Sequence, residues 1–193
     1  REVVIVVANF HTGGIASYVR SLIEVGLKED NFKFTVVCAH APSVTANSNI
    51  KVVSLKVPRP FNFWPVKEFI FALRATRFLN RLSGETILLN YSVFPGRFFK
   101  NNHVVSVFHS LHDKFVKASS IKSPLKFTLG VFHRICSVFD KIRRRHSRFS
   151  VFVSSRTYST YFRSENDLHI PNFYSTEPTP FSYSPDGRSI VLC

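Results

Sequence analysis

The sequence predicts an α/β fold built on a mostly parallel β-sheet. Short apolar runs, rich in β-branched and aromatic residues, alternate along the chain with longer segments that have helical spacing. The runs are continuously apolar, as expected for strands that are buried on both faces of a sheet. With 193 residues, of which 45% are hydrophobic, the chain is long enough to form one sizeable core.

The predicted elements follow in a regular order. The run Val3–Val7 is the first strand, and a loop separates it from an amphipathic helix over Ile15–Leu27. Further buried strands are predicted at Phe34–Cys38, Val52–Leu55, Ile87–Asn90, Val104–Phe108 and Phe149–Val153. Helical spacing occurs between the strands at 65–82, at 124–145 and from about 155 to 163.

The amino-acid composition of the sequence changes after Asn172. Residues 173–180 and 185–187 are rich in proline and turn-forming residues, and an apolar run resumes at 190–192. An apolar strand after such a linker is typical of a domain boundary, although an edge strand that returns to the same sheet has the same pattern. We therefore expect a domain over 1–173, a linker over 174–187 and the first strand of a truncated second domain over 188–193.

Basic residues are concentrated in one region of the chain. The formal net charge is +14, and residues 114–148 contain ten Lys/Arg against one acid, Asp140. Such a region favours phosphates of nucleic acid, of lipid headgroups or of a phosphorylated substrate. A solvated basic helix that has no partner is the simpler interpretation.

Cysteine usage and hydropathy indicate the compartment. The three cysteines have no CxxC spacing, which argues against a disulfide framework and against a thiolate zinc site. No apolar run approaches the length that spans a bilayer, and no secretory signal opens the sequence. We expect a cytoplasmic protein, with peripheral association at the inner face of the membrane as a further hypothesis. The glycosylation sequon at Asn90 is attributed to chance.

A glycine pair lies between the first predicted strand and the first predicted helix. Gly13 and Gly14 follow His11 and precede Ile15. Glycines there let backbone N–H groups approach a ligand, and the helix N-terminus adds a partial positive charge that suits a phosphate or sugar hydroxyls. A tight turn that binds nothing has the same sequence. The segment is not GxGxxG and no Walker lysine follows, so neither a dinucleotide fold nor a P-loop is predicted.

Four short sequence motifs occur in a characteristic order along the chain. They are the strand and His-Thr-Gly-Gly-Ile loop at 3–15, the strand ending in histidine at 104–109, the strand ending in serine at 149–155 and the Ile-Pro-Asn segment at 168–172. This order resembles the N-terminal domain of the retaining glycosyltransferases of family four, which have the GT-B fold. The resemblance implies a Rossmann-like, doubly wound sheet that forms the acceptor-side half of a two-domain enzyme.

The resemblance also implies roles for individual residues. In that family the glycine loop lies close to the phosphates and sugar of the donor, and the histidine after the strand hydrogen-bonds the transferred sugar. The corresponding residues of this chain are His11, Gly13, Gly14, Ile15 and His109. The family often has His-Asp at the end of the strand that corresponds to 104–109, whereas here Ser110 follows His109 and it is His112 that precedes Asp113, so His112 competes with His109 for the catalytic role.

The resemblance implies a nucleotide-sugar as co-substrate, with no metal or other cofactor in this domain. The paired glutamates near the donor would belong to the second domain, so we expect residues 1–193 alone to be inactive. His103, His109 and His112 lie close in sequence, but alternation along a strand separates neighbours and no acidic cluster completes a metal shell. For His109 the alternative is a core histidine satisfied by backbone groups.

Two segments are candidates for contact with an acceptor or an anionic membrane. Along 124–145 an apolar stripe has helical spacing and consists of Leu125, Leu129, Phe132, Ile135, Phe139 and Ile142. Packing on the sheet is the ordinary explanation of that stripe, but the cationic run that closes the helix suits anionic headgroups. In the second segment, 58–65, prolines prevent a regular element and leave aromatics beside cations, which suits headgroups or an acceptor groove equally. We assign to this surface Arg59, Phe61, Phe63, Trp64, Lys67, Lys141, Arg143, Arg144 and Arg145.

The sequence thus favours transfer of a sugar from a nucleotide-sugar to an acceptor that is lipid-linked or polyanionic. The alternative from another class is a nucleic-acid- or polyanion-binding module without catalysis, which the charge supports. No helix-turn-helix, zinc finger or RNP-type aromatic pattern accompanies that charge. An inactive carbohydrate-binding relative is a third possibility.

Overall fold

Seven strands form the centre of the molecule. The computed structural model describes residues 1–8, 10, 14–28, 31–39, 49–61, 63, 66–90, 98–109, 124–161 and 164–171. The strands are β1 (Glu2–Val6), β2 (Lys33–Cys38), β3 (Ile50–Ser54), β4 (Thr86–Leu89), β5 (His103–Phe108), β6 (Phe149–Phe152) and β7 (Asp167–His169). The expected linker and second domain, 174–187 and 188–193, lie outside the described residues.

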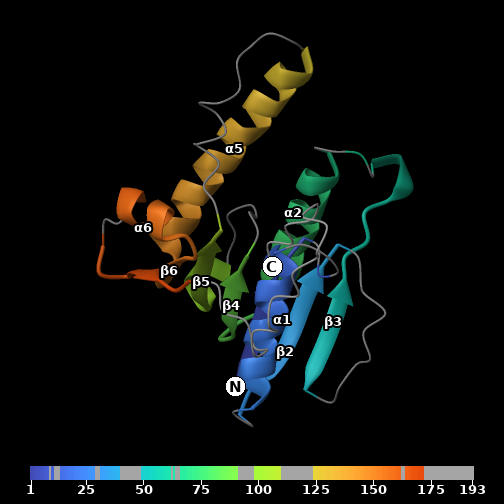
Figure 1. Ribbon diagram of the computed structural model, residues 1–193. Coiled ribbons are helices and arrows are strands. Elements are labelled where there is room, and N and C mark those ends of the chain that lie inside the picture. The colour runs from blue at the N-terminus through green and yellow to red at the C-terminus, as the bar shows by residue number, and fades with distance from the viewer. Residues whose placement is uncertain are drawn as a thin grey trace, which may run out of the picture.

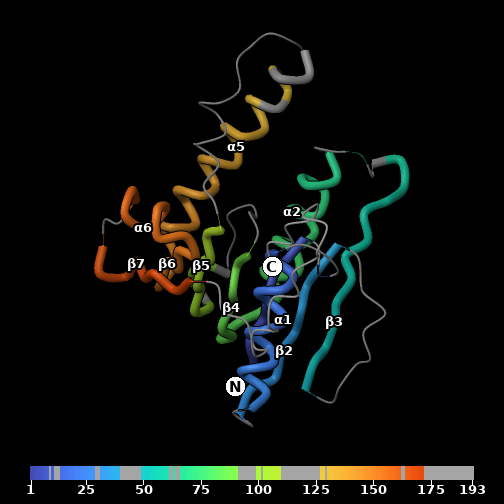
Figure 2. The backbone as a smooth tube through the Cα atoms, viewed as in Figure 1, coloured from blue at the N-terminus to red at the C-terminus, as the bar shows by residue number. Residues whose placement is uncertain are grey.

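All neighbouring strands pair in parallel, in the order β3-β2-β1-β4-β5-β6-β7 (Figures 1 and 2). From β1 the chain moves outward to β3, returns to the other side of β1 at β4, and then continues to β7. The α/β, Rossmann-like architecture predicted from the sequence is confirmed. The reversal between β1 and β4 is a topological switch point, and ligands of open parallel sheets bind at the carboxyl ends of the strands beside such a point.

Helices cover both faces of the sheet, as a doubly wound fold requires. Helix α1 (Gly14–Leu27) lies on one face, and α2 (Val66–Leu79), α5 (Pro124–His146) and α6 (Ser155–Tyr161) lie on the other. This distribution follows from right-handed crossovers, because the chain passes α1 while moving outward and α2 while moving back. Two short elements, η1 (Arg59–Phe61) and α3 (Phe98–Asn101), precede α2 and β5.

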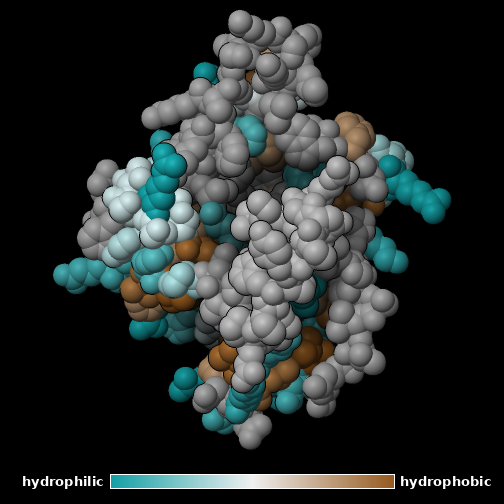
Figure 3. Space-filling model, viewed as in Figure 1, coloured by the Kyte–Doolittle hydropathy of each residue, from teal (hydrophilic) through white to brown (hydrophobic). Residues whose placement is uncertain are grey.

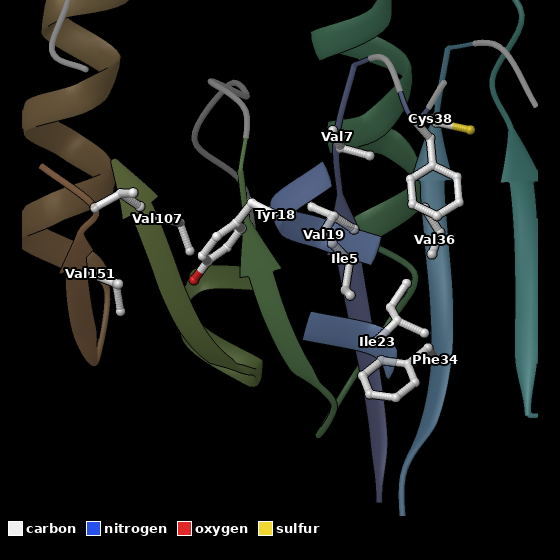
Figure 4. Close-up of a cluster of buried hydrophobic side chains, with 12 residues drawn as sticks. Ile5, Val7, Tyr18, Val19, Ile23, Phe34, Val36, Cys38, Val107 and Val151 are labelled. Atoms are coloured by element: carbon white, nitrogen blue, oxygen red, sulfur yellow. The ribbon is translucent and has the colours of Figure 1, made fainter. Parts of the chain in front are cut away.

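Strand alternation divides the core into two layers. On the α1 face, Val19 and Ile23 pack against Ile5 of β1 and Val36 of β2, and Tyr18 extends toward Val107 of β5 (Figure 4). On the other face, side chains of α2 pack against the intervening residues of β1 and β4. Side chains of successive strand residues point to opposite faces, so continuous apolar runs are what this double cover needs.

Helix α5 is longer than the strands beside it. It contains 23 residues, and its C-terminal turn is anchored where Ser147 Oγ lies 2.7 Å from Ser106 Oγ of β5. Because Arg143 already lies over the ring of Phe108, the last residue of β5, most of α5 projects past the carboxyl edge of the sheet (Figure 1). Phe132 of this projecting part packs edge to face on Phe69 of α2, with ring centroids 5.3 Å apart.

The structure corrects the predicted buried face of this helix. Phe132 is buried as predicted, but Ile135 is 37% exposed, and the buried positions continue instead through Cys136, Asp140 and Arg143. The reason is geometric: 132, 136, 140 and 143 lie on one side of the helix, whereas 135 lies about 100° around the helix axis from 136. The helix therefore packs through a face that carries two charges.

A smaller prediction also needs correction. Prolines were expected to prevent any regular element over 58–65, but Arg59–Phe61 forms a 3-10 turn, whose geometry tolerates proline in its first positions. None of the helices within the described ranges combines the length and apolar character that crossing a bilayer would require.

Candidate functional site

Polar side chains meet at the carboxyl edge of the sheet beside the switch point. Asn90 directly follows β4 and His109 directly follows β5, and these strands are neighbours. His109 Nε2 lies 3.2 Å from Asn90 Oδ1. The backbone N–H of Asn90 donates to the carbonyl of Val6 at the end of β1, over 3.0 Å. The pair is therefore held by three adjacent strand ends.

Helix α1 brings an aromatic ring to the same place. The rings of Tyr18 and His109 meet edge to face, with centroids 5.2 Å apart and planes at 84°. Tyr18 is buried, and burial raises the pKa of its hydroxyl. Gly14, the first residue of α1, lies one turn before Tyr18. The start of α1 and the histidine therefore lie at one edge of the sheet and on one face, as the sequence predicts for Gly14 and His109.

Asn90 is the member of the cluster that the sequence interpretation missed. Only 5% of its surface is exposed, and its Nδ2 has no hydrogen-bond partner among the described residues. A buried amide N–H group without a partner costs about 1–3 kcal/mol, so it is a place where a ligand oxygen gains a bond. The signal was a polar residue at the end of the apolar run Ile87–Leu89, where a strand end meets the binding edge.

The electrostatics of the cluster keep His109 neutral. Burial, followed by the positive charge of Arg143, lowers the pKa of His109 from 6.5 to about 4. With Asn90 Oδ1 facing the ring, Nε2 carries the proton and donates, which leaves Nδ1 as an acceptor. The cluster thus offers an acceptor on His109 and a donor on Asn90, and neither carries charge at neutral pH.

The start of α1 is uncrowded and lies one helical turn from Tyr18 of this cluster. A Cβ atom on Gly14 would meet no described heavy atom within 4 Å, and Ile15 is 38% exposed. Arg20 fixes the approach to the helix by donating to the carbonyl of Phe10 over 3.3 Å and to Ser17 Oγ over 3.2 Å. The other predicted loop residues, His11 and Gly13, lie outside the described residues, as does His112.

The residues predicted to contact an acceptor or a membrane differ in their exposure to solvent. Arg59 and Phe63 are exposed, the latter to 56%, and Lys67 is half-buried at the start of α2. Lys141 and Arg145 are exposed on α5. Trp64 and the side chain of Phe61 lie outside the described residues, so their assignment stays a prediction.

The assignment of Arg143 to this surface is wrong. Its side chain is 4% exposed, its guanidinium lies 4.5 Å from the centre of the Phe108 ring, and its Nη2 lies 3.6 Å from Asp140 Oδ1. Burial lowers the pKa of Arg143, and the neighbouring Asp140 carboxylate opposes that change. From the sequence, Arg143 was predicted to be one of the exposed cations at a helix end. In the structure its contacts with the Phe108 ring and the Asp140 carboxylate bury it.

Arg144 is also withdrawn from the predicted surface. Its Nε donates to Asp167 Oδ1 over 3.2 Å, and its Nη2 donates to Asp167 Oδ2 and to the carbonyl of Tyr161. Its guanidinium also lies over the Phe152 ring, 5.5 Å from the centroid. Arg144 therefore joins α5 to the end of α6 and to β7.

Histidines at the two ends of β5 do not form one site. His103 begins the strand and its exposed ring lies 3.3 Å from Arg148 through Nδ1, whereas His109 follows the opposite end. Within the part of the chain that the structure describes, no three His, Cys, Asp or Glu side chains gather as metal ligands do. His112 is not among these residues, so the expectation of no metal site stays a prediction.

Comparison with models of known protein families gives no match for this sequence, and comparison with curated proteins gives no significant similarity. Function is therefore inferred from the geometry of the switch-point cluster, which we define as Tyr18, Asn90 and His109.

Proposed function

We propose that this chain is the acceptor-side domain of a retaining glycosyltransferase that takes its sugar from a nucleotide-sugar donor. One observation carries the proposal: the switch-point cluster places the unpartnered Nδ2 of Asn90 and the neutral imidazole of His109 near the uncrowded start of α1. The resemblance of the loop at 9–18 and of the strand at 104–109 to family-four enzymes agrees with that position.

The cluster has the chemistry that sugar hydroxyls require. A hydroxyl both donates and accepts, and Asn90 Nδ2 and His109 Nδ1 supply one donor and one acceptor. With a pKa of about 4, His109 remains neutral at pH 7. The cluster therefore favours alcohol groups over anions. The edge-to-face contact between the two rings holds the imidazole in place beside Tyr18.

The N-terminus of α1 has a complementary task. The N–H groups at the start of a helix and the helix dipole favour negative charge, which suits the diphosphate of a nucleotide-sugar. In glycosyl transfer with retention, charge develops on the leaving diphosphate, and preorganised donors stabilise that charge. In the proposed enzyme α1 contributes to this stabilisation, while His109 and Asn90 orient the transferred sugar. No step uses a metal held by this domain.

The acceptor side is assigned to the exposed segment before α2. Arg59 and Phe63 are exposed there, and Lys67 is half-buried. A ring beside cations suits an acceptor that is lipid-linked or polyanionic. The alternative, a module that only binds polyanions, has lost support because Arg143 and Arg144 are withdrawn from the predicted cationic surface.

Binding of nucleotide-sugars to the full chain, followed by saturation-transfer NMR, tests the proposal. We expect signals from the sugar protons for at least one donor in a panel of uridine and guanosine diphosphate sugars. Asn90→Leu and His109→Phe, which keep volume but remove the polar atoms, should each weaken binding about tenfold, since one good hydrogen bond is worth roughly 1–2 kcal/mol.

His103→Gln is the matched control, because it changes an exposed histidine at the opposite end of the same strand. It should leave binding unchanged. The proposal fails if no nucleotide-sugar binds, or if the control weakens binding as much as the two cluster variants while all remain folded.

A further inference from the structure

Helix α5 has a second face, which points away from the fold and is apolar. Four side chains spaced by four, four and three residues are exposed to between 37% and 58%: Phe127, Val131, Ile135 and Val138. This spacing places them in one stripe on the helix surface. Large apolar groups that are exposed in a row are unusual on a helix that already has a buried face, and such patches mark interaction sites.

Cations accompany this stripe, and acids do not. Arg134, Lys141 and Arg145 are exposed, and Val138 lies four residues after the first and three before the second. The only acid in the sequence of α5 is Asp140, and it is buried on the opposite face. The outer face of α5, which we define as these four apolar residues and three cations, is therefore apolar along its centre and purely cationic at its flank.

We propose that the outer face of α5 lies on an anionic membrane surface, with its apolar side chains at the acyl boundary and its cations among the headgroups. An amphipathic helix with this composition binds in the plane of the interface, where apolar burial and attraction to anionic lipid act together. The projection of α5 past the sheet leaves the helix accessible to such a plane (Figure 1). The cytoplasmic leaflet, which is rich in anionic lipid, has the required charge.

The other occupants fit the outer face less well. In a symmetric pair of helices from two copies, Arg134, Lys141 and Arg145 would approach their own counterparts, and each chain has a net charge of +14. Nucleic acid would satisfy the cations but would leave Phe127 and Val138 against a polar backbone. Of these three occupants, only a bilayer supplies negative charge and an apolar layer side by side over the length of this stripe.

Another exposed apolar area is less suited to a membrane. Leu168 and Ile170 are exposed around β7. In the space-filling view hydrophilic side chains interrupt the hydrophobic ones in this part of the molecule (Figure 3). Among the described residues of β7 and its flanks, 164–171, there is also no cation to match the row that accompanies α5. We therefore use Leu168 as a control position.

Flotation of the full chain with lipid vesicles tests the inference. Vesicles of phosphatidylcholine containing phosphatidylglycerol should carry the protein upward, whereas vesicles of phosphatidylcholine alone should not. Val131→Ser with Val138→Ser should lower the partition coefficient about tenfold or more, because two apolar side chains leave the acyl boundary. Substitution of Arg134, Lys141 and Arg145 by Gln should lower it roughly fivefold for each cation.

Each variant has a control of the same chemistry. Val25→Ser with Leu168→Ser removes two apolar side chains that are exposed to a similar extent. Lys28, Lys33 and Lys51, all exposed, give a triple Gln variant with the same loss of charge. Both controls should retain the flotation of the parent protein, and circular dichroism should show that every variant is folded.

Three outcomes would overturn the inference. Equal recovery with neutral and anionic vesicles removes the electrostatic part, and equal losses in controls and α5 variants remove the location. A loss on removing the cations without a loss on removing the valines indicates a polyanion in place of a bilayer. The inference is independent of the proposed function, because no residue of the switch-point cluster is changed and nucleotide-sugar binding by the same variants should persist.

Discussion

The two faces of α5 reverse the usual distribution of polar and apolar groups. The inner face buries Asp140 and Arg143 together with Phe132 and Cys136, while the outer face exposes four large apolar side chains. Each reversal has a physical cause. The buried charges compensate one another and the guanidinium of Arg143 lies over the Phe108 ring, whereas nothing within the described residues covers the outer stripe. A helix inverted in this way must be explained by its contacts, because its hydrophobic pattern alone gives the wrong orientation.

The largest expected effect comes from breaking the inner face. Arg143→Leu removes the cation beside a buried carboxylate, and loss of one partner of a buried pair destabilises by about 3–5 kcal/mol. Arg143→Leu combined with Asp140→Leu should recover most of that loss, since apolar groups of similar volume replace buried pairs well. Urea unfolding followed by circular dichroism measures both. If the double variant is as unstable as the single one, stacking on Phe108 and not the ion pair holds the inner face.

The next effect is a pH dependence of the free energy of unfolding. It links the inner face to the switch-point cluster because Arg143 contributes, after burial, to the lowered pKa of His109. His109 has a folded pKa of about 4 against 6.5 ordinarily, so the unfolded chain takes up a proton in this window that the folded chain refuses. His109 therefore contributes a stability that is present above pH 6.5 and is lost as the pH falls toward 4. The loss is at most about 3.4 kcal/mol, at 1.36 kcal/mol for each unit of pKa difference, and solvent screening of the partly exposed ring reduces it.

The measurement is the free energy of unfolding as a function of pH for the parent and for His109→Gln, whose difference isolates this group from the carboxylates. The parent should lose more stability than the variant between pH 6.5 and 4. His103→Gln, which changes the exposed histidine of the same strand, should follow the parent curve. A His109→Gln curve that parallels the parent would mean that this imidazole titrates alike in both states.

The sheet could be predicted because its signal is local. Each buried strand is a continuous apolar run, and β1, β2 and β5 begin or end within two residues of the predicted bounds. Parallel pairing follows from helices placed between strands, since parallel strands need crossover connections. The position of Gly14 and His109 at one edge follows in turn, because all carboxyl ends of a parallel sheet share an edge.

The polar contacts could not be predicted in the same way, because they depend on residues far apart in sequence. Asn90 is separated from His109 by 19 positions, and Arg144 from Asp167 by 23. Sequence patterns locate charges on a helix but do not reveal which of them finds a partner in another element. Asn90, Arg143 and Arg144 were all misjudged for this reason.

The smallest effect separates two neighbouring arginines that the sequence treats alike. Arg144 donates to both oxygens of Asp167, whose side chain is 2% exposed, and to a carbonyl of α6, whereas Arg145 is exposed on the outer face. Lysine keeps the charge but not the planar fork, so Arg144→Lys should lower the free energy of unfolding by about 1–2 kcal/mol. Arg145→Lys should change it by less than about 0.5 kcal/mol, as surface substitutions do. Thermal unfolding of the two variants side by side measures the contrast, and equal values would mean that the contact with Asp167 adds nothing to stability. Since Arg145→Lys also keeps the cation of the outer face, it should float with anionic vesicles like the parent.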